Sequence, residues 1–144
     1  MKQVLAVLLL GASLVCSNAA AQGVVQIMTP AGNMVAVPVI VTPGLGDIAR
    51  GGNGRVLVDP YLMTLPFEFQ QLVFAHEGAH AIGIMNEAQA DYFAGVTLRI
   101  AGFTPNQMQT VFACMLQFLS PMGDGRHPPS RQRVGIVQAG YASQ

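Results

Sequence analysis

The sequence predicts an α+β fold, with a small N-terminal β-sheet packed against about four helices. Short runs rich in β-branched residues fill the chain between residues 23 and 59, which is typical of strands. From residue 66 onwards, apolar residues recur at spacings of three and four, which is typical of helices that bury one face. Strands therefore come first and helices after, and this order favours an α+β arrangement over alternating βαβ units.

Length and composition limit the class of protein. A chain of 144 residues corresponds to one domain, and 51% hydrophobic with only 10% charged residues indicates a compact apolar core. Basic and acidic residues balance at 7 each, so the chain lacks the basic surplus of a nucleic-acid-binding protein. We therefore expect no nucleic-acid partner.

Residues 1–21 have the pattern of a secretory signal peptide. Lys2 precedes an apolar run over 4–15, and the small residues before position 22 end with Ala21. The run is shorter than the roughly 20 residues that a membrane span requires, so we expect no membrane span. The sequence predicts cleavage after Ala21 and export of a single domain, residues 22–144, to the periplasm or the medium.

The two cysteines predict no disulfide within the exported chain. Cys16 lies in the predicted signal peptide, and lipidation there is disfavoured because Val15 stands where a small residue would precede a lipid-modified cysteine. Cys114 sits in an apolar helical pattern without a polarising neighbour, which favours a buried core residue over a thiol nucleophile. Stability must then come from the core and from any bound metal.

Three segments describe the predicted sheet. The runs 24–28 and 34–41 flank a turn that contains Pro30 and Gly32, which indicates a hairpin. The glycine-rich segment 42–54 favours a mobile loop. Residues 55–59 form a short strand stopped by Pro60, and this strand is the expected exposed edge to which an extended substrate would add.

Four helices follow from start and stop signals. Their predicted ranges are 66–82, 87–101, 105–119 and 130–140. Asn86 is the N-cap of the second helix, Thr104 opens the third with a capping box, and Ser130 caps the last. Gly83 and Gly102 end the first two helices.

The first helix carries a complete HExxH motif, His76-Glu77-Gly78-Ala79-His80. Because four residues make just over one helical turn, both imidazoles project from one face and can share a zinc ion at about 2.0–2.1 Å. Glu77 borders that face and can deprotonate a zinc-bound water. The alternative is a helix whose two histidines are ordinary surface or hydrogen-bonded core residues.

The second helix offers the third ligand. Glu87 and Asp91 stand one turn apart on one face, so Glu87 can complete the zinc site and leave the fourth position for water. Asp91 can accept a hydrogen bond from the free nitrogen of a liganding imidazole. For Glu87 the alternative is a favourable charge at a helix N-terminus. A different alignment, HExxHxxGxxH, would place Asn86 at the last ligand position, where a neutral amide is a poor zinc ligand.

Three elements together resemble the M48-like gluzincin metallopeptidases. They are His76-Glu77-Gly78-Ala79-His80, then Glu87-Ala88-Gln89-Ala90-Asp91, then His127-Pro128-Pro129-Ser130-Arg131-Gln132-Arg133-Val134, which are similar to the HExxH, ExxAD and late HPxxxxR elements of that family. The similarity spans about residues 55–134. It implies a minimal zincin-like fold, one zinc held by His76, His80 and Glu87, and Glu77 as general base.

The resemblance also implies a place near the site for the late histidine. His127 would donate a hydrogen bond to the oxyanion of the tetrahedral intermediate, as a catalytic residue beside Glu77. The alternative is a plain loop histidine before Pro128. Arg133 would either orient His127 or pair with a carboxylate.

The predicted function is therefore that of an exported zinc-dependent metallopeptidase acting on a peptide or protein substrate. The alternative is a proteolytically inactive metal-binding or interaction module of the same fold. An intact Glu77 favours the peptidase, because metal binding alone does not require a base.

Overall fold

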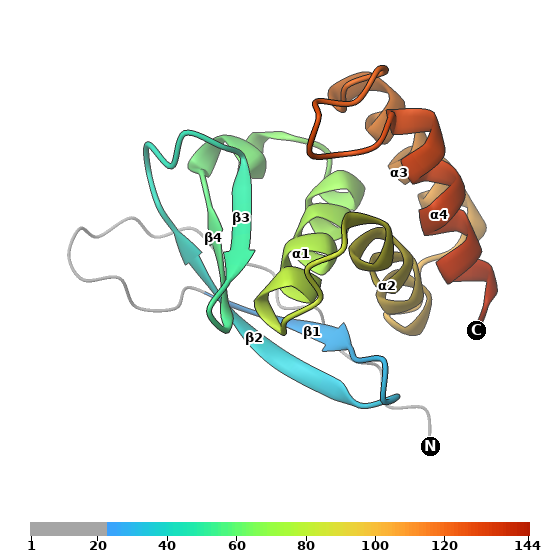
Figure 1. The fold of residues 1–144 in the computed structure, drawn as a ribbon, viewed down its shortest axis with the longest axis horizontal. Coiled ribbons are helices and arrows are strands. Elements are labelled where there is room, and N and C mark those ends of the chain that lie inside the picture. The colour runs from blue at the N-terminus through green and yellow to red at the C-terminus, as the bar shows by residue number, and fades with distance from the viewer. Residues whose placement is uncertain (1–22) are drawn as a thin grey trace.

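The computed structural model describes residues 23–144, which form a four-stranded sheet and four α-helices (Figure 1). The α+β class is thus confirmed. The signal peptide predicted over residues 1–21 and its cleavage site lie outside the described residues. Within residues 23–144, no helix combines the length and the apolar character needed to cross a bilayer.

The sheet has the strand order β1-β2-β4-β3. Strands β1 (Gly23–Met28) and β2 (Met34–Val41) form the predicted antiparallel hairpin, in which Met28 lies opposite Met34. Strand β4 (Arg55–Val58) pairs in parallel with β2, and β3 (Ala49–Gly52) pairs antiparallel with β4.

Two predictions about this sheet are wrong. The segment 42–54 is not all loop, because β3 lies within it, and β4 is not an edge strand, because β3 covers its outer side. One of the glycines that indicated a loop, Gly51, has another role. A Cβ atom on Gly51 would collide with the backbone carbonyl of Glu77, so the edge strand can lie against the helix only with glycine there.

The helices follow the predicted order. They are α1 (Phe67–Ala81), α2 (Glu87–Ile100), α3 (Pro105–Phe118) and α4 (Ser130–Ala142), with a short 3-10 helix η1 (Pro60–Thr64) before α1. Asn86 and Thr104 cap α2 and α3 as predicted, the latter with the full capping box. The predicted cap at Ser130 is wrong: Pro129 occupies the N-cap position without a side-chain bond, and α4 runs past Gly140.

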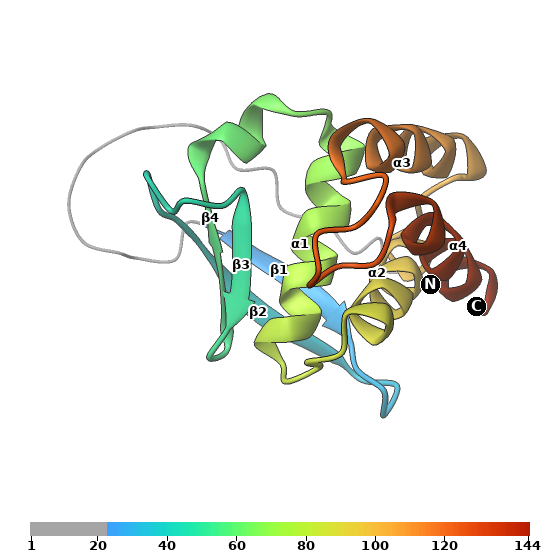
Figure 2. The same cartoon turned by 45° about the horizontal axis from the view of Figure 1, so that its top comes forward.

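Helix α1 forms the centre of the molecule. It lies between the sheet on one side and α2, α3 and α4 on the other (Figures 1 and 2). Alternate strand residues bury against it, as the period of a half-buried strand requires: Val25, Ile27, Val37, Val39, Val56 and Val58. Buried side chains of α1 and α3 continue the same core, and Cys114 of α3 is one of them. Cys114 is thus the predicted core residue, and burial raises the pKa of its thiol.

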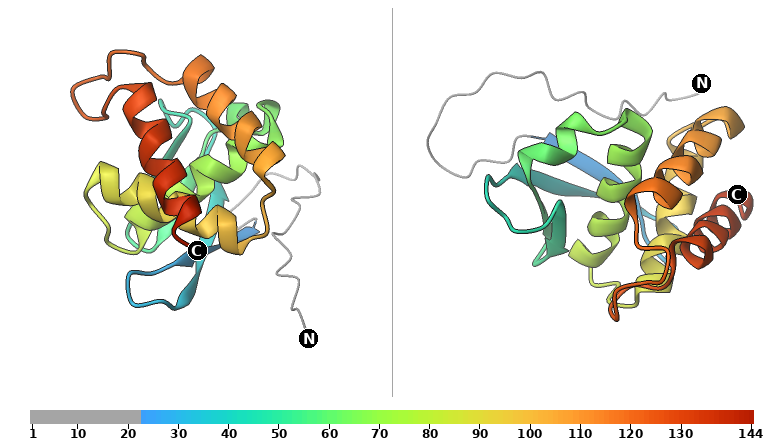
Figure 3. Two further views of the ribbon diagram at one scale, coloured as in Figure 1. Left: turned by 90° about the vertical axis from the view of Figure 1, so that its right-hand side faces the viewer. Right: turned by 90° about the horizontal axis from the view of Figure 1, so that it is seen from above.

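Helices α2 and α4 pack side by side, as the views in Figure 3 show from two further directions. Their backbones meet at two glycines. A Cβ atom on Gly95 would collide with the carbonyl oxygen of Val137, and one on Gly140 with that of Tyr92. This close approach brings the first turn of α4, which carries Arg133, close to the first half of α2, which carries Glu87 and Asp91.

We expect Gly140→Ala to lower the free energy of unfolding by about 1–3 kcal/mol, because the added methyl group forces the two helices apart. Gly135→Ala on the same helix is the control, since a Cβ there meets nothing within 4 Å. That control should raise stability by about 0.5–1 kcal/mol through a better helix propensity. Chemical denaturation measures both changes, and equal effects would contradict the packing at the two glycines.

Candidate metal centre

Helix α1 places the two histidines of the HExxH motif together. His76 and His80 are both buried, and their rings meet edge to face with centroids 4.7 Å apart. The two Nε2 atoms are separated by 3.1 Å. This is the convergence that the spacing of four residues predicts.

The Nδ1 atoms of both rings are held by fixed acceptors. His76 Nδ1 lies 2.8 Å from Asp91 Oδ1, and His80 Nδ1 lies 2.7 Å from the carbonyl oxygen of Ile84. Because a carbonyl and a carboxylate oxygen can only accept, each Nδ1 carries a hydrogen and donates it. In the neutral rings the two Nε2 lone pairs then face each other, an arrangement that a shared cation stabilises.

The short turn between the motif and α2 places Ile84 and Glu87 beside the two histidines. Gly83 adopts a φ of 97°, which favours glycine, and the Ile84 N–H donates to the carbonyl of Ala79 at 3.0 Å. The Asn86 side chain accepts from the N–H of Gln89 at 3.0 Å. Asn86 therefore acts as a helix cap, which disfavours its alternative alignment as a ligand.

Glu87 contacts all three histidines of the cluster. Its Oε2 atom lies 3.2 Å from His76 Nε2, 3.4 Å from His80 Nε2 and 3.3 Å from His127 Nε2. None of these contacts has hydrogen-bond geometry, so Oε2 is a buried oxygen without a donor among the described residues. A buried carboxylate oxygen on which three imidazole nitrogens converge is suited to a bound cation.

His76, Glu87 and His127 each offer a ligand atom, and these three atoms lie within 4.8 Å of one another. The group could therefore hold a metal ion. His80 Nε2 lies close to the same point, at 3.1 Å from His76 Nε2.

Asp91 ties the histidine pair to α4. Its carboxylate is fully buried and accepts two hydrogen bonds of 2.8 Å from the Arg133 guanidinium, and its Oδ1 atom also lies 2.8 Å from His76 Nδ1. Burial acts to raise the pKa of Asp91, but the contacts with Arg133 and His76 outweigh it and lower that pKa. Of the two roles foreseen for Arg133, the structure shows pairing with a carboxylate.

His127 lies at the site on the loop before α4, with its side chain 26% exposed. Asp124 holds it through two contacts: Oδ2 lies 2.9 Å from Nδ1, and Oδ1 accepts the His127 backbone N–H at 2.6 Å. These hydrogen bonds lower the pKa of Asp124 to about 2. Asp124 was not predicted from the sequence as a site residue, although the Asp124-Gly125 pair is a recognisable turn signal.

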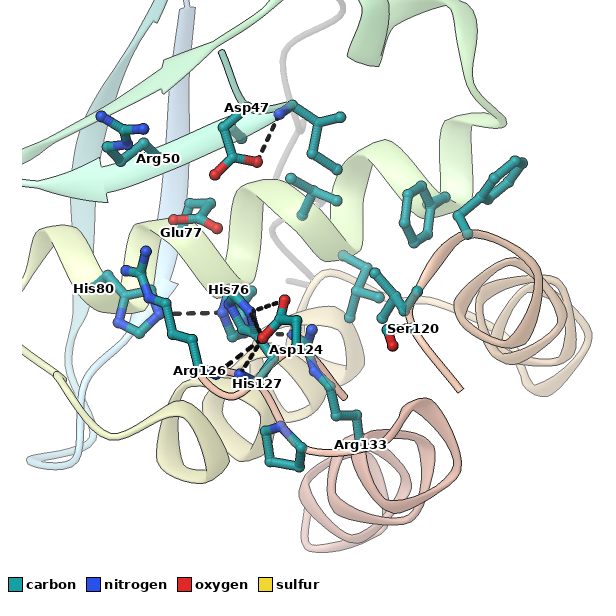
Figure 4. A pocket seen from close by; sticks show the side chains of 18 residues that line it. Asp47, Arg50, His76, Glu77, His80, Ser120, Asp124, Arg126, His127 and Arg133 are labelled. Atoms are coloured by element: carbon teal, nitrogen blue, oxygen red, sulfur yellow. Dashed lines mark hydrogen bonds and ion pairs between the residues drawn. The ribbon is translucent and has the colours of Figure 1, made fainter. Parts of the chain in front are cut away.

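Glu77 borders the opposite side of the histidine pair. Figure 4 shows its carboxylate on the side of β3, whereas His127 and Asp124 lie on the side of the loop before α4. The Gly51 N–H of the edge strand donates to Glu77 Oε2 at 2.6 Å. A cavity of about 290 Å³ opens here, and Glu77, His76, His80 and His127 all line it.

The charges of the cluster matter for any cation that binds. Burial acts to lower the pKa of His76, but contacts with Asp91 and Glu87 outweigh it and raise the value to about 9. Burial likewise opposes ionisation of Glu87, yet the neighbouring imidazoles lower its pKa to about 2. At neutral pH a metal ion must therefore displace a proton from His76, while Glu87 is already ionised.

Comparison with known proteins adds no relative. Neither a scan against protein-family models nor searches of curated proteins and of solved structures find a match to this chain.

Proposed function

We propose that the chain is an exported zinc-dependent metallopeptidase that hydrolyses peptide bonds with a zinc-activated water. One observation carries this proposal: His76 Nε2, His80 Nε2 and Glu87 Oε2 are separated by 3.1, 3.2 and 3.4 Å. Tetrahedral zinc with bonds of about 2.0–2.1 Å keeps its ligand atoms roughly 3.3 Å apart. The three atoms thus have the spacing of three corners of a zinc site, with the fourth corner left for water.

Each neighbouring residue then has a defined task. A zinc ion held by His76, His80 and Glu87 would supply a Lewis acid and would lower the pKa of a bound water. Glu77, positioned by the Gly51 N–H, accepts a proton from the attacking water and returns it to the departing amine. His127, whose Nδ1 donates to Asp124, would donate from Nε2 to the oxyanion of the tetrahedral intermediate when both of its ring nitrogens carry a hydrogen.

The sequence motifs support the same proposal. The resemblance to M48-like gluzincins implies that Asp91 and Arg133 belong to the site, and they contact each other and His76 through buried hydrogen bonds. We propose on this basis that the fold is a minimal zincin-like one. The outer edge of β3, which pairs with no strand among residues 23–144, borders the cavity and takes the place of the strand first expected to pair with an extended peptide.

A second function is favoured by one specific contact. His127 Nε2 lies 3.3 Å from Glu87 Oε2, which is also a ligand-to-ligand spacing. If His127 took the fourth corner, the site would be closed, and closed zinc sites serve structure rather than catalysis. The chain would then be a proteolytically silent metal-binding module.

Hydrolysis of an unbiased peptide library tests the proposal. The purified exported protein is assayed as loaded with zinc, after removal of the metal by a chelator, and after addition of one equivalent of zinc. We expect cleavage in the first and third samples only. Tight zinc binding without cleavage over a wide pH range would overturn the peptidase and support the silent module.

We expect Asp91→Asn to weaken zinc binding by about 10–100-fold, because the His76 imidazole loses its charged acceptor and Arg133 loses its buried partner. Glu87→Gln should weaken it more, since a ligand itself is lost. Asn86→Ala is the control and should leave zinc affinity unchanged, because Asn86 only caps α2. Competition with a chelating dye measures all three affinities, and an unaltered affinity in Glu87→Gln would contradict the proposed ligand set.

A further inference from the structure

The cavity at the candidate metal centre has two chemically different ends. Figure 4 shows Arg50 and Arg126 on the side of His80, and Ser120 at the opposite side. Ser120 follows directly after apolar lining residues at the end of α3, and further apolar lining comes from α1 and from the residue before β3. These residues are Ile48, Phe69, Leu72, Val73, Phe118 and Leu119.

The apolar end follows α1 away from His76. Leu72 and Val73 precede His76 by one turn and Phe69 by two, which places this lining within about 10 Å of the histidine along the helix axis. Ser120, the polar group at this end, has its hydroxyl engaged in a bond of 2.7 Å to the carbonyl of Gly123. An incoming apolar group therefore meets no unpaired hydroxyl there.

We propose that this end of the cavity binds a bulky apolar side chain adjacent to the bond that is cleaved, and that Phe118 determines which side chain fits. The proposal rests on the proposed function, because it assigns part of the substrate to the same cleft. The cavity of about 290 Å³ lies close to the lower end of the range of ligand pockets, which suits one bulky side chain beside the metal centre.

Phe118 has the position that such a role requires. It is the last residue of α3, and its ring packs on the buried Phe69 ring with centroids 5.2 Å apart. The Phe118 side chain nevertheless remains 39% exposed and lines the cavity. An apolar group bound there would cover this ring, whereas a charged group would lose its hydration without gaining a partner.

Two hydroxamate probes test the proposal without requiring catalysis. The zinc-loaded protein is titrated by calorimetry with N-acetylglycine hydroxamate and with N-acetylphenylalanine hydroxamate, which share the metal-binding group and differ in the side chain. We expect the phenylalanine probe to bind at least about tenfold more tightly. Equal affinities, or no binding of either probe, would overturn the proposal.

Three variants locate the determinant. Phe118→Ala should reduce the ratio of the two affinities to near one, and Phe118→Leu should give an intermediate ratio. Leu116→Ala is the matched control, because Leu116 is on the same helix, is 49% exposed and does not line the cavity. Its ratio should equal that of the wild type. An unchanged ratio in a folded Phe118→Ala, with its thermal unfolding transition intact, would overturn the assignment.

The peptide library tests the proposed function separately from the hydroxamate probes. Selective probe binding with no peptide cleaved would refute the peptidase and leave an apolar ligand site beside the metal. Cleavage with no preference for apolar residues near the cut would refute this inference and leave the peptidase standing.

Discussion

Glu77→Gln is expected to retain one zinc per chain and the wild-type fold while lowering kcat for peptide hydrolysis by about 10²–10⁴-fold. The amide oxygen can still accept the hydrogen bond that the Gly51 N–H now donates, so the contact between β3 and α1 should survive. The amide cannot take a proton from the attacking water, and this is the single function that the substitution removes.

Zinc content by elemental analysis and cleavage of the peptide library give the two readouts for Glu77→Gln. Glu68→Gln makes the same chemical change on the same helix, at a residue that does not line the cavity, and should behave as wild type. Undiminished hydrolysis by Glu77→Gln would show that another group is the base.

His76→Ala should have the largest effect on the metal. It removes the ring whose Nε2 lies within 3.2 Å of both His80 Nε2 and Glu87 Oε2, so we expect zinc content to fall to near zero. Metal-binding energy is also folding energy. Zinc at a thousand times its dissociation constant should stabilise the wild type by about 4 kcal/mol and the variant by almost nothing.

Thermal unfolding with and without zinc measures this difference. His127→Ala is the informative companion, because His127 shares Glu87 but is assigned to the oxyanion. It should keep its zinc-dependent stabilisation and lose turnover by roughly 10²–10³-fold. A zinc-induced rise in stability that is the same in His76→Ala and the wild type would place the metal elsewhere.

Much of the fold could be predicted because its boundaries are encoded locally. The caps at Asn86 and Thr104 and the left-handed glycines after α1 and α2 mark helix ends in the sequence itself, and the structure has those ends. The hairpin is equally local, since Met28 and Met34 are separated only by their turn.

What the sequence did not predict depends on contacts between distant segments. Strand β3 was missed because its two glycines are typical of a loop, and the need for glycine at position 51 appears only when α1 lies against it. The cap predicted at Ser130 failed because this residue is buried as the first residue of α4, behind Pro129.

In the candidate site, too, the contacts between residues close in sequence could be predicted and those between distant segments could not. His76 and His80 converge because one helix fixes them, and Glu87 follows after a short turn, so the motif alone predicts their proximity. The bond from Arg133 to Asp91 joins residues 42 apart and depends on the glycine contact between α2 and α4. Asp124 reaches His127 through the conformation of a loop, which no periodic pattern reports.

The central proposal is that two imidazoles and one carboxylate hold zinc and leave a fourth position for water. X-ray absorption at the zinc edge of the loaded protein tests this claim most directly, because multiple scattering counts the imidazole ligands. We predict four nitrogen or oxygen ligands at about 2.0–2.1 Å, two of them imidazoles, with the same count in His127→Ala. Three imidazoles in the wild type and two in His127→Ala would contradict it, because the metal would then be closed off by His127.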